Sequence, residues 1–197
     1  VRAFAAHLGV EAQFETRPSI AAMTAALANG EGDIAAAGLT VTPARQARIL
    51  FGPSYKTVTE QLVCHNGGPA PTSIEDLGRA RIVVLAGSSY LESLQALPAR
   101  SEALRWTERA GGSAMPLLEA VDSGEFDCTI ADSHLADFAR RRHPDLVVAM
   151  DMGGEESLAW AYSGQVEGLG DVLTGWFSQI HEGDLLERLD EIWFGQF

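Results

Sequence analysis

Six residues stand just beyond three strand-like apolar segments, and they could together bind a small charged molecule. They are Thr40, Arg45, Gly87, Ser88, Ser89 and Asp132. Ligands of open α/β sheets bind outside the ends of the strands, where such groups meet. One arginine, one set of amides and hydroxyls, and one carboxylate are complementary to a zwitterion, which carries a carboxylate and an ammonium.

Each group suits one part of such a ligand. The guanidinium of Arg45 is planar, permanently charged and able to bind a carboxylate through two parallel hydrogen bonds. Gly87 begins a turn before a predicted helix, whose free amides and positive dipole end favour an anion. Asp132 supplies a charged acceptor for an ammonium. The alternatives are structural: Arg45 as a solvated helix residue, and Ser88, Ser89 or Asp132 as helix N-caps.

Catalysis by these residues is disfavoured. Asp132, Ser133 and His134 are the residue types of a hydrolase triad, but adjacent residues do not face one another, and the GxSxG nucleophile elbow is absent. The histidines lack HxH, HxxxH and HExxH spacing, so we expect no metal and no cofactor. An α/β hydrolase therefore ranks below a binding protein.

The elements that must position these residues alternate along the chain. Strands are predicted at 11–15, 33–40, 57–64, 81–86, 104–108, 127–131, 146–150 and 156–163, with helices between most of them and two helices after the last. Uninterrupted apolar strands alternating with helices indicate an α/β fold with mainly parallel sheets. Thr42 and Pro43 have the residue types of an N-cap and a first helical position, so a short helical turn should carry Arg45.

Composition restricts the class of ligand. The 197 residues are 46% hydrophobic, enough for a buried core, and the formal charge of −13 repels phosphate backbones and anionic lipid headgroups. Nucleic acid is therefore not an expected partner. No basic-then-apolar leader precedes Val1, and no window approaches a membrane span. Cys64 and Cys128 are expected to be buried free thiols, with a disulfide as the alternative.

Four segments, residues 32–55, 83–94, 124–138 and 183–195, resemble the amino-acid-binding family of bacterial extracellular solute-binding proteins, family 3. This resemblance implies a two-lobe, periplasmic-binding-protein-like (type II) α/β fold with a hinge. It also implies that Arg45 holds a ligand α-carboxylate, with Thr40 and the turn Gly87-Ser88-Ser89 completing its cradle. Asp132 occupies the position of the α-amino acceptor. The family opens with a strand that is not found before the helix at residues 1–8.

The implied lobes are discontinuous in sequence. Lobe 1 is expected to comprise residues 1–64 and 158–197, and lobe 2 residues 65–157. The glycine- and proline-rich loop 65–72 indicates the first boundary, and the crossings that form the hinge are expected near His65 and in 151–157. A ligand bound in the cleft between the lobes should favour a closed state.

A narrower resemblance covers nearly the whole chain. Residues 51–67, 129–152 and 158–160 are similar to the regulatory domains of membrane-bound lytic murein transglycosylases of the F type, and the run 142–149 is the most specific part. The resemblance implies a noncatalytic, ligand-sensing domain that binds an amino acid or a peptidoglycan stem peptide. The implied partner is a catalytic transglycosylase domain in a periplasmic parent chain attached to the outer membrane. The alternative is an amino-acid receptor of an ABC importer.

Overall fold

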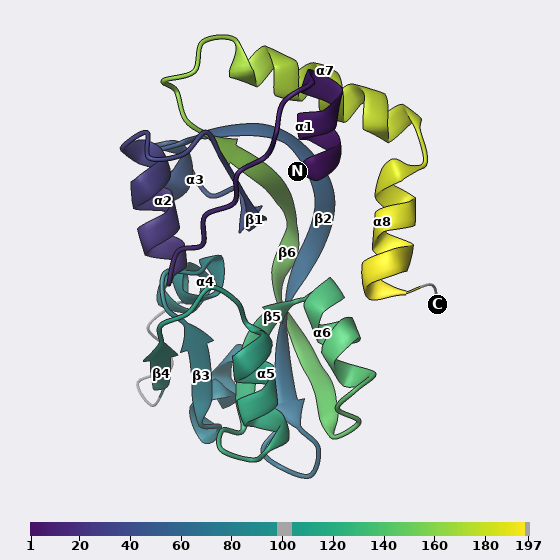
Figure 1. Cartoon of the computed structure of the whole chain (residues 1–197). Helices are drawn as coiled ribbons and strands as arrows, with labels where there is room; N and C mark the ends of the chain where they lie inside the picture. The colour runs from purple at the N-terminus through teal and green to yellow at the C-terminus, as the bar shows by residue number, and fades with distance from the viewer. Residues whose placement is uncertain (98–103, 196–197) are drawn as a thin grey trace. The chain divides into compact units, whose positions relative to one another are not determined.

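The computed structural model describes residues 1–97 and 104–195. The chain forms two compact units: unit 1 comprises Val1–Thr57 and Ser157–Phe197, and unit 2 comprises Val58–Glu156. Two long strands, β2 (Leu50–His65) and β6 (Leu146–Tyr162), contribute to both units (Figure 1). The lobe bounds and the hinge expected from the sequence stay predictions.

The strands form a mixed sheet in the order β1-β6-β2-β5-β3-β4. Strand β3 is parallel to both β4 and β5, as the strand–helix alternation predicts. Two other pairs differ from the expected parallel arrangement, because β1 is antiparallel to β6 and β2 is antiparallel to β5. The α/β class is therefore confirmed, with a mixed rather than mainly parallel sheet.

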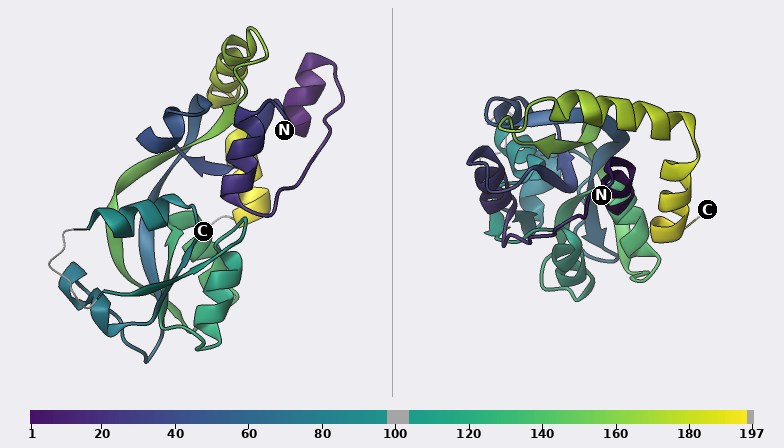
Figure 2. Two further views of the ribbon diagram at one scale, coloured as in Figure 1. Left: turned by 90° about the vertical axis from the view of Figure 1, so that its left-hand side faces the viewer. Right: turned by 45° about the horizontal axis from the view of Figure 1, so that its top comes forward.

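Unit 1 packs helices around β1 and the adjoining halves of β2 and β6. Its elements are α1 (Arg2–Leu8), α2 (Ile20–Ala28), β1 (Ile34–Thr40), α3 (Pro43–Gln46), α7 (Leu169–Glu182) and α8 (Leu185–Phe194). Phe4 of α1 packs against Trp176 and Phe177 of α7 in one buried cluster, and Figure 2 shows these two helices side by side. Burying such aromatic surface contributes most of the stability of a core of this kind.

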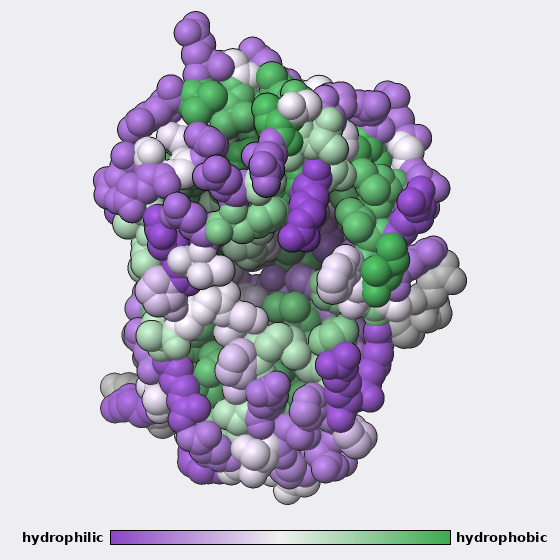
Figure 3. Space-filling view, viewed as in Figure 1, coloured by the Kyte–Doolittle hydropathy of each residue, from purple (hydrophilic) through white to green (hydrophobic). Residues whose placement is uncertain are grey.

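Helix α8 differs from the other helices because it buries no residue. Its apolar residues Leu189, Ile192 and Trp193 are exposed, and apolar surface lies over this part of the molecule in Figure 3. No helix in the described residues combines the length and the apolar character that crossing a bilayer requires.

Unit 2 surrounds its strands with short helices. Its elements are η1 (Ile74–Arg79), β3 (Ile82–Leu85), α4 (Ser89–Ala96), β4 (Trp106–Arg109), α5 (Met115–Asp122), β5 (Cys128–Asp132) and α6 (Ser133–Arg140). Every residue of β3 and β5 is buried. Strands covered on both faces read as continuous apolar runs, which explains why these two were evident in the sequence.

Two predictions about strands are wrong. Residues 11–15 form no strand, and Phe14 is exposed, with the guanidinium of Arg2 5.0 Å from the centre of its ring. An alternating pattern needs a partner strand to become a sheet, and residues 11–15 have none. The strands predicted at 146–150 and 156–163 are one continuous strand, β6, because extended backbone passes through the glycines between them.

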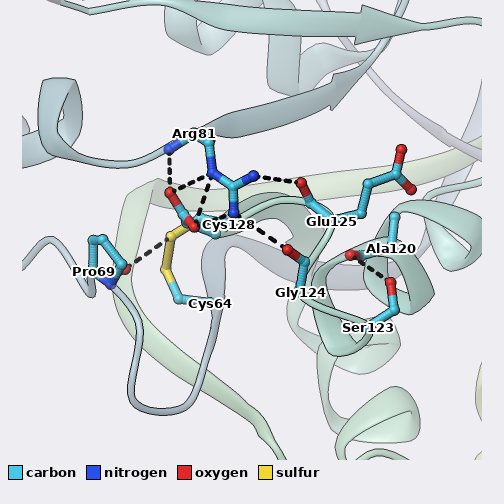
Figure 4. Close-up of polar contacts among 9 residues, drawn as sticks. Cys64, Pro69, Arg81, Ala120, Ser123, Gly124, Glu125 and Cys128 are labelled. Carbon is cyan, nitrogen blue, oxygen red and sulfur yellow. Dashed lines mark hydrogen bonds and ion pairs between the residues drawn. A yellow bond between two sulfur atoms is a disulfide. The ribbon is translucent and has the colours of Figure 1, made fainter.

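The expectation of free thiols is also wrong, because Cys64 and Cys128 form a disulfide. They face each other across the antiparallel pair β2–β5, and both are fully buried. Arg81 lies beside this pair and binds the Asp127 carboxylate, with Nη2 2.7 Å from Oδ1, and the carbonyl oxygens of Gly124 and Glu125 (Figure 4). The hydropathy of the sequence does not indicate this bond, because a buried cysteine has the same apolar neighbours in the sequence whether it is a free thiol or part of a disulfide.

Candidate functional site

The short helix α3 positions Arg45 in unit 1. The Thr42 hydroxyl accepts a hydrogen bond from the Arg45 amide at 3.4 Å, and Pro43 occupies the first turn. The predicted cap is therefore present. It ends the extended backbone after β1 and turns the chain within one helical turn, which brings Arg45 back toward the end of that strand.

Arg45 contacts the last residue of β1. Its Nη1 donates a hydrogen bond of 2.8 Å to the backbone carbonyl oxygen of Thr40. Arg45 is 8% exposed and Thr40 is 4% exposed, so the pair is buried and the reading of Arg45 as a solvated helix residue is wrong. A buried guanidinium held by a backbone acceptor is oriented before any ligand arrives.

Strand β1 changes register just before this pair. Its pairing with β6 shifts between Ala35 and Leu39, and Gly38 between them has a φ of 62°. This left-handed conformation suits glycine, which has no Cβ to clash. Such a bulge redirects the strand end that carries Thr40, and bulges commonly re-aim side chains in this way.

In unit 2 the turn Gly87-Ser88-Ser89 begins helix α4. Gly87 has a φ of 71°, and Ser88 is the N-cap, accepting from the Leu91 amide at 3.3 Å. The Ser88 hydroxyl also donates to the Leu85 carbonyl oxygen at 2.6 Å. The Ser88 side chain therefore serves the helix, and a ligand at this turn would use the backbone amides and Ser89.

Asp132 ends β5 and occupies the N-cap position of α6 without making a side-chain cap bond. It is 3% exposed. Its amide donates to the Tyr90 hydroxyl oxygen at 3.3 Å. The pKa of Tyr90 is raised well above its usual value, first by burial and then by the charge of Asp132. The tyrosine therefore keeps its proton and can donate to this carboxylate.

Glu60 is a second buried carboxylate at this place, and it was not predicted from the sequence. Glu60 lies opposite Asp132 in the β2–β5 register and is 2% exposed. Its Oε1 is buried and has no hydrogen-bond partner among the described residues. Side chains of a strand alternate between its two faces, and this alternation gave one sign that Glu60 is buried. Val58 and Leu62, on the same face of β2, are buried apolar residues.

The predicted site residues thus form two groups, one in each unit. Thr40 and Arg45 are in contact in unit 1. In unit 2, Tyr90 of the helix that begins at Gly87-Ser88-Ser89 contacts Asp132. Among residues 1–97 and 104–195, no three His, Cys, Asp or Glu side chains gather as metal ligands do. A guanidinium in unit 1 and the amides that begin α4 in unit 2 can bind a carboxylate, and the Asp132 carboxylate in unit 2 can bind an ammonium.

Comparison with known sequences gives a family match over almost the whole chain. The model of bacterial extracellular solute-binding proteins, family 3, matches residues 1–196. A membrane-bound lytic murein transglycosylase F of Maricaulis maris is 60% identical over 195 residues, which is 99% of this chain and 43% of that protein. The membrane-bound lytic murein transglycosylase F 1 of Alkalilimnicola ehrlichii is 40% identical over 162 residues, which is 82% of this chain and 33% of that protein. The chain spans less than half of these relatives.

Solved structures share the fold. An ancestral arginine-binding protein bound to arginine superposes with a TM-score of 0.86 at 20% identity, covering 98% of this chain and 85% of that one. An ancestral arginine-binding protein bound to glutamine superposes with a TM-score of 0.84 at 21% identity, covering 99% of this chain and 85% of that one. The fold is therefore the type II fold of periplasmic amino-acid-binding proteins.

Proposed function

The chain belongs to the bacterial extracellular solute-binding proteins, family 3, and we propose that it is the noncatalytic ligand-sensing domain of a peptidoglycan lytic transglycosylase. The observation that carries this proposal is the 60% identity to the Maricaulis transglycosylase over 99% of the chain. The domain has no catalytic role of its own. Its parent is a periplasmic, membrane-associated enzyme whose catalytic domain is the partner that responds to the ligand.

The ligand in this proposal is a zwitterion. Arg45 binds its carboxylate, since a buried guanidinium already oriented by Thr40 offers a planar pair of N–H donors. The amides at the start of α4 and Ser89 bind the same carboxylate. Asp132 binds the ammonium, because its carboxylate is a charged acceptor that lies buried at the end of β5.

A stem peptide of peptidoglycan meets these requirements. Its N-terminal amine is locked in an amide to the sugar, yet its diaminopimelate residue presents a free ammonium and a free carboxylate. Its terminal alanine adds a second carboxylate. A domain that reports on cell-wall fragments to a wall-cleaving enzyme would therefore use the same arginine and aspartate as an amino-acid receptor.

A free-standing amino-acid receptor of an importer is the second candidate. It is favoured by the structural likeness to arginine-binding proteins, one of which is bound to arginine and one to glutamine. The two functions require the same pair of charged groups and differ in ligand size. Only a sensor of wall fragments must accept a peptide whose remaining chain continues into solvent.

Calorimetry separates the two candidates. The 197-residue chain is titrated with the stem tetrapeptide L-Ala-γ-D-Glu-meso-diaminopimelate-D-Ala, with free diaminopimelate and with each common L-amino acid. We expect the tetrapeptide to bind more tightly than any single amino acid. Micromolar binding of one amino acid, with no detectable binding of the tetrapeptide, would overturn the sensor proposal and favour the importer receptor.

A further inference from the structure

The carboxylates of Glu60 and Asp132 form a buried acidic pair in unit 2. Residues directly opposite each other in an antiparallel pair place their side chains on the same face of the sheet. Glu60 and Asp132 are such a pair, and both are almost completely buried. Two formal negative charges therefore lie side by side, where like charges destabilise a sheet.

Tyr90 is influenced by both carboxylates. Its hydroxyl oxygen accepts the Asp132 amide. Burial raises the pKa of Tyr90 most, and the charges of Asp132 and then of Glu60 raise it further. The register places both carboxylates on the same face of the sheet, and the shared effect on Tyr90 agrees with that placement.

The fold gives Glu60 no evident structural task. A buried carboxylate is expensive unless it is paired and hydrogen-bonded. The Oε1 atom of Glu60 has no hydrogen-bond partner, and Glu60 forms no ion pair among the described residues. An apolar residue would suit a position that lies between Val58 and Leu62 on a buried face.

We propose that Glu60 is a specificity-determining residue that adds a second carboxylate to the ammonium subsite of Asp132. This inference rests on the proposed function, and it names the group that the subsite requires. A primary ammonium carries three N–H donors, so it can serve two carboxylates at once. An N-acylated amine or a hydroxyl supplies fewer donors and no charge, and would leave a buried carboxylate unpaired.

An organic cation fits the subsite better than a metal ion does. Calcium takes six to eight oxygen ligands and magnesium requires an octahedral set. Two carboxylates and one tyrosine hydroxyl fall short of either set, and the described residues hold no larger cluster of potential metal ligands. The ligand class is therefore a zwitterion with an unmodified primary amine, which includes free amino acids and the diaminopimelate end of a stem peptide.

The test compares Glu60→Gln with the wild type and with Glu119→Gln, which removes the same charge from an exposed position of α5. Each protein is titrated with the stem tetrapeptide, with diaminopimelate, with each common L-amino acid, and with the α-hydroxy analogue of the tightest amino acid. Glu60→Gln should weaken zwitterion binding by about 10- to 100-fold, the usual loss for a hydrogen bond to a charged group. It should also reduce the preference for the amine over the hydroxy analogue, while Glu119→Gln changes neither.

Ligand-free thermal unfolding distinguishes this role from a structural one. Because an unpaired buried carboxylate is costly, Glu60→Gln should unfold at a higher temperature than the wild type. Lower stability with unchanged affinity would show a structural residue and overturn the inference. If the wild type binds none of the probes, the proposed function fails. The inference is then judged by unfolding alone: a higher temperature for Glu60→Gln supports it, and an equal or lower temperature overturns it.

Discussion

The Arg45 side chain donates a buried hydrogen bond of 2.8 Å from Nη1 to the carbonyl oxygen of Thr40. Thr40 ends β1 and Arg45 lies in the next helix, so the strand and the helix turn hold the guanidinium in a fixed direction. A donor group oriented in this way loses less conformational entropy when it binds a carboxylate.

Replacing Arg45 should therefore abolish tight binding. Arg45→Ala should cost on the order of 2–4 kcal/mol of binding free energy, because it leaves the ligand carboxylate unpaired. Arg45→Lys keeps the charge but not the planar pair of donors, and should recover only part of the loss. Arg48→Ala, at an exposed position three residues along, is the control. Calorimetry with the ligand that the wild type binds would exclude Arg45 from the site if all three variants kept wild-type affinity.

Asp132 should be required for any ligand with a free amine. Asp132→Asn keeps the shape of the side chain but removes a charge-assisted acceptor, so affinity should fall by about 10- to 100-fold. The matched variant Asp145→Asn changes an exposed carboxylate of the same unit and should have no effect. Equal affinities for wild type and Asp132→Asn would assign the ammonium subsite to other residues.

The disulfide should contribute substantially to the stability of unit 2. It joins residues 64 positions apart, and a bond closing such a loop typically stabilises a protein by about 2–4 kcal/mol. The double variant Cys64→Ala with Cys128→Ala should unfold at lower denaturant concentration than the wild type. A reductant should lower wild-type stability and leave the double variant unchanged. An identical response of both proteins to reductant would show that the bond carries none of the stability.

Acid should weaken the contribution that the ion pair of Arg81 and Asp127 makes to the stability of the fold. The hydrogen bond from Arg81 is the main cause that lowers the pKa of Asp127 below its ordinary value of 3.8. Because the pKa of Asp127 is lower in the folded state than in the unfolded state, its ionised form stabilises the fold. This stabilisation is complete at pH values above the unfolded-state pKa and is lost as the pH falls through the folded-state pKa. Asp127→Asn should therefore be less stable than the wild type at pH 7, and the difference should shrink below about pH 4.

Denaturant unfolding at a series of pH values measures this difference. Asp137→Asn is the control, because Asp137 lies 3.6 Å from Arg140 in an exposed pair on one helix. Such surface pairs contribute little. A stability difference between wild type and Asp127→Asn that stays constant from pH 7 to pH 2 would contradict the assigned pKa shift.

Much of the fold followed from local signals. Buried strands such as β3 and β5 are continuous apolar runs, and Ser19, Thr42 and Ser88 cap helices as their residue types predict. Asp132 was evident because it directly follows such a run. What failed depended on distant partners: residues 11–15 alternate without a neighbouring strand, and the antiparallel direction of β1 and β2 is set by the strands beside them.

Glu60 and the cysteines escaped prediction for a related reason. A glutamate in an alternating strand is usually solvated, and only the register against β5 shows that Glu60 lies beside Asp132. The same register places Cys64 against Cys128. Pairings between residues more than 60 positions apart in the sequence cannot be read from local periodicity.

The shared register gives the disulfide a second consequence. Glu60, Leu62 and Cys64 alternate along one face of β2, opposite Asp132, Ile130 and Cys128 of β5. Two adjacent carboxylates repel each other, and a slip of β2 by one residue would relieve that repulsion by turning Glu60 to the opposite face. The covalent bond forbids this slip, because it fixes which residue of β2 faces which residue of β5. Cys64 and Cys128 thus hold the register that keeps Glu60 beside Asp132, which is the arrangement that the proposed ammonium subsite requires.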